Sequence, residues 1–230
     1  MTLHTDQQFE AELQSLHGLL LRMGGLVERQ ITHSIESLVE RDSDLANEVI
    51  DRDREVNKLD IDVDEHCLKL LALHQPTASD LRFITTALKI TTDLERIGDQ
   101  AVNTCERALE LNEEPVLKPY IDIPRMAEIA QRMVRTSLDA FVRRDIDLAA
   151  QVIGEDDEVD RLAHQVYREL LSYMAEDPTT IARATRILFI SKYLERIADH
   201  ATNIAEMVVF MVKGRMIRHQ AKLPPEAGTA

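Results

Sequence analysis

The sequence has few of the residues that interrupt helices. Only 7 Gly and 7 Pro occur among 230 residues, of which 44% are hydrophobic and 30% are charged. This hydrophobic share is enough to build a globular core, and it excludes an intrinsically disordered chain. Because the commonest residues favour helix or tolerate it well, we expect an all-helical protein.

Cysteines and long apolar runs are also scarce. The two cysteines, Cys67 and Cys105, lie far apart and form no CxxC pair. This spacing argues against a disulfide framework or a thiolate zinc site, fits a reducing compartment, and predicts that both are small core residues. The longest apolar run, residues 207–212, is far shorter than the roughly 20 residues of a membrane span, and residues 1–13 do not resemble a leader peptide. We therefore expect a cytoplasmic protein that reaches a membrane only through its partners.

Positive charge is in short supply. Asp and Glu outnumber Lys and Arg by 41 to 27, so the formal net charge at pH 7 is −14. Such a chain repels the phosphate backbone of a nucleic acid, and no basic stripe with interleaved aromatic residues offsets that repulsion. We therefore expect no direct binding to DNA or RNA.

What the sequence does contain is a regular helical pattern. Apolar residues recur at i, i+3, i+4 and i+7, and prolines stand between the stretches with this spacing. These prolines are Pro76, Pro115, Pro119, Pro124 and Pro178. Taken as helix boundaries, they predict six helices over residues 6–40, 44–73, 79–112, 124–144, 147–175 and 179–218. Asp177 is placed to cap the last helix, with Pro178 at its first position. Gly24 and Gly25, in the middle of the first helix, indicate a bend or the close approach of another backbone.

The two halves of the chain repeat each other. At an offset of 103, Val49, Ile50, Asp53, Glu55, Val56 and Leu59 match Val152, Ile153, Asp156, Glu158, Val159 and Leu162. At an offset of 100, Leu94, Glu95, Arg96, Ile97 and Asp99 match Leu194, Glu195, Arg196, Ile197 and Asp199. We therefore predict an all-α fold of two tandem antiparallel three-helix bundles related by internal duplication. The bundles are expected over residues 1–115 and 116–220, followed by a flexible tail over 221–230.

Carboxylates repeat together with the apolar residues. At about 100° per residue, Glu95 and Asp99 fall on the same apolar face of the third helix as Leu88. Glu195 and Asp199 occupy the matching places in the second half. Because a carboxylate is seldom buried without a partner, we expect each pair to need a counter-charge.

The second helix of each half adds more oxygen ligands. Asp53 and Asn57 lie beside a seam of apolar residues, and Asp156 and Asp160 do so in the second copy. Residues four apart lie one turn above each other, so two such steps on neighbouring helices form a cage of carboxylate and amide oxygens. This donor set suits divalent or trivalent ions of Mg, Mn or Fe, with Zn less favoured.

Three alternatives stay open at this point. The acids could pair with basic neighbours at the helix surfaces, for which the candidates are Arg96, Arg196, Lys58 and Arg161. The chain could also be a helical scaffold without metal, or a metal-dependent oxidase or hydrolase. Ferritin-like di-iron oxidases use Glu-x-x-His twice, but Gly98 and Ala198 stand at the His positions, and His200 matches Gln100 in the first copy.

Three motifs in order resemble the PhoU family of phosphate-signalling regulators. They are QPTASDLR at residues 75–82, DLERIGD at residues 93–99 and LERIAD at residues 194–199. The Met23-Gly24-Gly25 segment is similar as well, and the resemblance covers residues 6–218.

The resemblance implies two metal-binding bundles and a regulatory rather than an enzymatic role. Members of the family are negative regulators of phosphate uptake and of the phosphate-starvation (Pho) regulon. They contact the phosphate ABC transporter and a membrane sensor histidine kinase, and they form homodimers or larger oligomers. On this chain the resemblance places the metal ligands at Asp53, Asn57, Glu95, Asp99, Asn103, Asp156, Asp160, Glu195, Asp199 and Asn203. Because Asn57 lacks the charge of its match Asp160, we expect the first site to be the weaker one.

Two further segments are candidates for contacts outside the core. Pro76, Asp80 and Arg82 are candidate partner contacts, although Ser79 or Asp80 could equally cap a helix and Arg82 could pair locally. The apolar run 207–212 has basic residues after it. Core packing with cations at a helix C-terminus explains that run, and a membrane-surface or dimer contact is the alternative.

Overall fold

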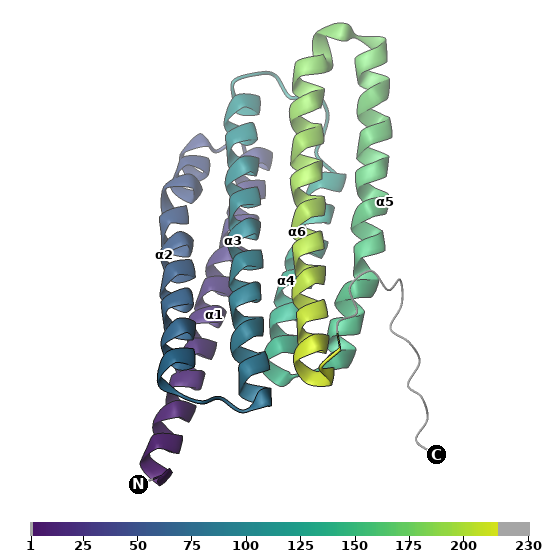
Figure 1. Ribbon diagram of the computed structural model, residues 1–230. Helices are drawn as coiled ribbons and strands as arrows, with labels where there is room; N and C mark the ends of the chain where they lie inside the picture. Colours follow the sequence, from purple (N-terminus) through teal and green to yellow (C-terminus); the bar gives the residue numbers. More distant parts are fainter. Residues whose placement is uncertain (1, 216–230) are drawn as a thin grey trace, which may run out of the picture.

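The computed structural model describes residues 2–215, and side chains from residue 7 onward. This part of the chain contains six long helices and no strand (Figure 1). They are α1 (Thr2–Val39), α2 (Ser43–Leu73), α3 (Ala78–Asn112), α4 (Asp122–Arg143), α5 (Ile146–Glu176) and α6 (Ile181–Lys213), with a short 3₁₀ helix η1 (Pro178–Thr180) before α6. The prediction of an all-α fold with six helices is confirmed. The expected tail over residues 221–230 lies outside the described residues.

The helices form two antiparallel three-helix bundles that lie side by side. Helices α1, α2 and α3 pack together, as do α4, α5 and α6. Figure 1 shows α3 and α6 adjacent in the middle, with α2 and α5 on the outer flanks and α1 and α4 behind. The two bundles also pack directly on each other, through α3 against α6 and α1 against α4. Buried apolar side chains from all six helices form one continuous core, so the two repeats share their hydrophobic interior.

A glycine allows the close approach of α1 and α4. A Cβ atom placed on Gly24 would lie 2.2 Å from Cδ1 of Leu138 on α4, which no side chain tolerates without movement. A Cβ atom on Gly25 would meet no atom within 4 Å. The close approach at Gly24 is therefore made by a side chain of α4 and not, as predicted, by another backbone.

The ends of α6 show one confirmed and one wrong boundary. Asp177 accepts a hydrogen bond from the backbone N of Thr179 at 2.9 Å, and Pro178 follows it, so the predicted cap is present and begins η1. The helix was expected to continue to residue 218, but it ends at Lys213. Gly214 there takes a left-handed conformation with φ 66°, a common way for a helix to end.

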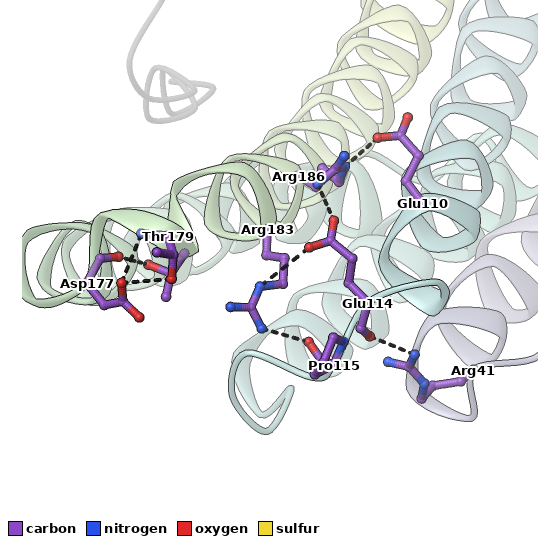
Figure 2. A network of polar contacts seen from close by, with 9 residues as sticks. Arg41, Glu110, Glu114, Pro115, Asp177, Thr179, Arg183 and Arg186 are labelled. Atoms are coloured by element: carbon purple, nitrogen blue, oxygen red, sulfur yellow. Dashed lines mark hydrogen bonds and ion pairs between the residues drawn. The ribbon is translucent and has the colours of Figure 1, made fainter.

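Side chains from both bundles form ion pairs and hydrogen bonds at the segment that connects α3 to α4 (Figure 2). Arg186 on α6 pairs with Glu110 near the end of α3 and, at 2.9 Å, with Glu114 in the connection. Arg183, one turn earlier on α6, also pairs with Glu114. Arg41, between α1 and α2, donates to the backbone carbonyl of Glu114 at 2.8 Å. These contacts fix where the chain leaves the first bundle and enters the second.

Candidate functional site

The first acidic cluster lies between α2 and α3. Burial, and next the neighbouring Asp99, raise the pKa of Glu95. Burial, and next Asp53 on α2, raise the pKa of Asp99. The pKa of Asp60, further along α2, is raised by burial and then by a neighbouring aspartate. The structure thus brings together carboxylates that the sequence placed on separate helices, at distances where each opposes the ionisation of the next.

These acids lie at the rim of the bundle rather than in its core. The side chain of Glu95 is 26% exposed and that of Asp99 is 38% exposed, so the prediction of a buried pair is wrong. Leu88, on the same stripe, is also only half-buried, whereas Leu94 and Ile97 are fully buried. The buried centre of α3 is therefore rotated away from the acids. Half-buried carboxylates at the edge of a bundle are accessible to ions from solvent.

The second acidic cluster lies between α5 and α6. Burial raises the pKa of Asp156 to about 6, with further contributions from Asp199, Asp160, Asp157 and Glu195. Partial desolvation, and next Glu195, raise the pKa of both Asp160 and Asp199. At neutral pH these groups carry negative charge against mutual repulsion, which a cation would relieve.

The two clusters differ in the hydrogen bonds that their matching aspartates accept, Asp53 in the first cluster and Asp156 in the second. In the first, Asp53 accepts hydrogen bonds from Nε2 of Gln30 at 3.0 Å and from Nδ2 of Asn57 at 2.8 Å. In the second, no hydrogen-bond donor within residues 7–215 contacts the matching Asp156. The reason is in the sequence, because the repeat places Met133 where the first copy has Gln30, and a carboxylate where it has Asn57. Amide groups thus stabilise the charge of the first aspartate but not of the second.

Gly98 on α3 leaves room for the hydrogen bond from Gln30 to Asp53. A Cβ atom on Gly98 would lie 3.1 Å from Oε1 of Gln30 and 3.3 Å from Oδ1 of Asp53. The second copy has Ala198 at this position, fully buried. Gln30 is itself only 6% exposed, and its Oε1 has no hydrogen-bond partner among the described residues. An orphaned oxygen beside a carboxylate fits the donor chemistry of a cation site.

Basic side chains also stand among the acids. Arg96 lies 3.4 Å from Glu95 and 3.5 Å from Asp99, while its own side chain is 57% exposed. Lys192 pairs with Glu195 in the second cluster. Arg161 instead donates to the backbone carbonyl of Asp157. Exposed pairs of this kind contribute about 0–1 kcal/mol, so they do not prevent exchange of the base for another cation.

The carboxylates are close but do not converge on one point. Within residues 2–215, no three His, Cys, Asp or Glu side chains are arranged so that they could hold a metal ion as they stand. The oxygen donors are nevertheless of the type that Mg, Mn and Fe ions select. Because these side chains are at least partly exposed, rotation about their χ angles could bring them onto a shared ion.

Two predicted asparagine ligands are placed differently from the acids. Asn203 donates Nδ2 to Oδ1 of Asp93 on α3 at 3.3 Å, so it faces the seam between the two bundles. The side chain of Asn103 has no hydrogen bond to any other described residue. His200 also faces the seam, with Nδ1 at 2.8 Å from the same Asp93 oxygen. Sequence reasoning missed this role of Asp93, because its match in the second copy is Tyr193 and nothing in the repeat marks it.

The segment predicted to contact partners makes contacts within the chain. Neither Ser79 nor Asp80 is the N-cap of α3. Thr77 has that role, and Asp80 completes a capping box by accepting from the backbone of Thr77 at 3.3 Å. Arg82 does not pair locally but donates Nε to the carbonyl of Met211 on α6 at 3.2 Å. Pro76 is half-buried between α2 and α3.

Both cysteines are fully buried and unpaired, as predicted. Burial raises the pKa of Cys67 and of Cys105 to about 12, so neither thiol is reactive at neutral pH. No helix within residues 2–215 has both the length and the apolar character needed to cross a membrane.

The chain is similar to proteins of one family along nearly its whole length. The family model of the PhoU domain matches twice, at residues 20–108 and 123–208. The phosphate-specific transport system accessory protein PhoU homolog of Pseudomonas aeruginosa is 44% identical over 220 residues, which is 95% of this chain and 91% of that protein. The PhoU protein of Escherichia coli is 39% identical over 216 residues, covering 94% of this chain and 90% of that one.

Solved structures agree with these matches. The crystal structure of PhoU from Pseudomonas aeruginosa aligns with a TM-score of 0.87 over 90% of this chain and 100% of that one, at 44% identity. The phosphate transport system regulatory protein PhoU from Streptococcus pneumoniae aligns with a TM-score of 0.85 at 28% identity, over 90% of this chain and 98% of that one. Since both repeats match the domain model and the relatives are aligned almost end to end, this chain belongs to the PhoU family.

Proposed function

We propose that this chain is a negative regulator of phosphate uptake and of the phosphate-starvation response. It acts in the cytoplasm as an adaptor between the phosphate ABC transporter and a membrane sensor histidine kinase, as a homodimer or larger oligomer. The observation that carries the proposal is the alignment over 95% of the chain with a protein named as an accessory protein of the phosphate-specific transport system. An accessory protein of this kind works by contact with its partners and needs no catalytic centre.

We further propose that the acidic clusters bind divalent or trivalent metal ions, with Mg, Mn or Fe preferred over Zn. The support is the type of ligand and the crowding of charge, since Asp156 has four acidic neighbours and no hydrogen-bond donor. A bound ion would neutralise these carboxylates and link α5 to α6. In the first cluster, Gln30 and Asn57 already stabilise Asp53, so we expect weaker binding there.

No observation favours the alternative of a metal-dependent oxidase or hydrolase. That activity would need a free acid or base beside the metal, such as His200, which directly follows the proposed ligand Asp199. The ring of His200 is instead engaged by Asp93 at the seam between the bundles. The side chains of both acidic clusters therefore serve the adaptor proposal better than a catalytic one.

Deletion of the gene tests the regulatory proposal. In phosphate-rich medium the deletion strain should express the phosphate-starvation genes constitutively, and the wild-type gene supplied in trans should restore repression. A phosphate response that stays normal in the deletion strain would refute the regulatory assignment. Co-purification with the nucleotide-binding subunit of the transporter tests the proposed partner separately, and a reproducible failure to co-purify would remove that partner from the proposal.

A further inference from the structure

A hollow lies between α1 and α2 in the first bundle and is lined by residues of these two helices. Its floor is apolar and includes Val49 and Val56, and its rim includes Arg29, His33 and Arg52. Gln30, which donates to Asp53, also lines the hollow. Glu48 and Glu55 complete the lining, so two arginines and a histidine stand among two carboxylates in a chain whose net charge is −14. We call this hollow, defined by these residues, the α1–α2 groove.

The matching positions of the second bundle form an ion pair that the groove lacks. At an offset of 103, Arg29 matches Arg132 on α4, and Arg52 matches Glu155 on α5. Arg132 and Glu155 form an ion pair across the two helices, with Nε to Oε2 at 3.1 Å. In the first bundle both positions carry arginine, so the carboxylate that joins the helices is missing. His33, which matches Thr136, adds a third basic group.

The basic groups of the groove are largely without partners. Among the described residues, the side chains of Arg29 and His33 make no hydrogen bond or ion pair. Arg52 pairs with Glu48 on its own helix at 2.9 Å, and both side chains are strongly exposed, at 63% and 46%. An exposed pair four residues apart on a helix contributes only about 0.3–0.5 kcal/mol. Arg52 is therefore available to another anion at little cost.

We propose that the α1–α2 groove binds a small oxyanion between Arg29 and Arg52, with His33 at its edge. The anion takes the place that the Glu155 carboxylate has in the second bundle and links α1 to α2. Guanidinium groups bind phosphate, sulfate and carboxylate oxygens through paired N–H donors, which is the chemistry that the groove offers. Glu48 and Glu55 also line the groove, so affinity is expected to be modest, on the order of 1 mM. This proposal stands on the groove itself and is independent of the regulatory role.

The test measures thermal unfolding of the full chain with increasing inorganic phosphate, sulfate or acetate. Ionic strength is held constant with chloride, and a chelator removes any metal that could bind the anion elsewhere. For the wild type we expect a saturable rise in Tm with at least one of the three anions. A preference for phosphate and sulfate would assign a tetrahedral ligand, and a preference for acetate would assign a carboxylate. The absence of a saturable rise with all three anions would overturn the proposal.

Two variants that change the net charge by the same amount distinguish anion binding in the groove from a general effect of net charge. Arg52→Glu copies the arrangement of the second bundle, so it should lose the response to anions while its Tm without anion equals or exceeds that of the wild type. Arg54→Glu changes an exposed position of α2 outside the groove and should keep the response. Arg29→Gln should weaken the anion roughly tenfold or more, because one charge-assisted donor pair is lost. Equal responses in Arg52→Glu and Arg54→Glu would contradict the proposal.

Discussion

His200 on α6 and Asp93 on α3 join the two bundles, with Nδ1 of the histidine 2.8 Å from Oδ1 of the aspartate. Both side chains are largely buried, at 22% and 15% exposed, and Asn203 donates to the same oxygen at 3.3 Å. The seam between the repeats therefore contains a polar cluster within mostly apolar surroundings. The geometry of this cluster depends on how α3 packs against α6, so a change in the cluster reflects a change in the packing of the two repeats on each other.

Removing this contact should destabilise the chain. His200→Ala leaves the Asp93 carboxylate partly buried without its main partner, which we expect to cost about 1–3 kcal/mol of unfolding free energy. Urea denaturation followed by circular dichroism measures the change. Asn103→Ala is the control for loss of a polar side chain from the same part of the repeat, because the Asn103 side chain makes no hydrogen bond to a described residue. An equal loss in both variants would show that the contact does not stabilise the seam.

The adjacent glycines of α1 should respond to alanine in opposite directions. Gly24→Ala forces a methyl group against Leu138 and should destabilise the chain by about 1–3 kcal/mol. Gly25→Ala meets no neighbour and should be neutral or stabilise the helix by about 0.5–1 kcal/mol. Thermal unfolding of both variants checks the prediction. Adding Leu138→Ala to Gly24→Ala should remove the steric part of the loss, and a strictly additive effect of the pair would argue against direct contact.

The second acidic cluster should make stability depend on pH. Because the pKa of Asp156 rises from 3.8 to about 6 on folding, the folded chain keeps a proton that the unfolded chain releases. The unfolding free energy contributed by this group therefore falls as pH rises from about 4 to about 6. Asp156→Asn should reduce this dependence, with Asp160 and Asp199 retaining part of it, and stabilise the metal-free chain at pH 7 by roughly 1 kcal/mol. Urea denaturation at pH 4.5 and pH 7 with chelator present measures both effects.

The matching substitution in the first cluster should act with the opposite sign. Asp53 accepts hydrogen bonds from Gln30 and Asn57, so Asp53→Asn loses charge-assisted bonds and should destabilise the chain by about 1 kcal/mol or more at pH 7. If Asp53→Asn and Asp156→Asn change stability in the same direction, the difference that we describe between the two clusters has no energetic consequence.

Metal binding should depend more on the second cluster than on the first. Manganese added to the chelator-treated chain should raise Tm. The gain in unfolding free energy depends on the ratio of the ion concentration to Kd, and it is about 2.7 kcal/mol when the concentration is a hundred times Kd. Glu195→Gln should reduce the rise more than Glu95→Gln does. Elemental analysis of protein purified without chelator gives the occupancy. Absence of metal in that protein, together with an unchanged Tm on adding Mg, Mn or Fe ions, would eliminate the metal proposal.

Several features of the fold follow from local signals in the sequence. The prolines and the apolar spacing predict six helices, and most boundaries lie within a few residues of the observed ones, because helix formation depends on neighbours in the chain. The repeat also brings matching acids onto matching helices. The sequence difference between Asn57 and Asp160 anticipates that the clusters are unequal, although not that Gln30 contributes to the difference.

Other features arise only when the helices pack together. The periodicity of α3 relates Glu95 and Asp99 to each other, but the packing of α3 against its neighbours decides how deeply they are buried, and that burial is only partial. Gly24 differs from Gly25 only because α4 passes on one side of α1.

The sequence by itself determined the helices, the duplication and the acidic positions, since each is a local or repeated pattern along one chain. The tertiary structure alone decided the contact of Gln30 with Asp53, the contact of Asp93 with His200, and the placement of Arg29 and Arg52 on one groove between α1 and α2. These contacts join residues on different helices, and their geometry depends on how the helices are rotated and spaced against one another.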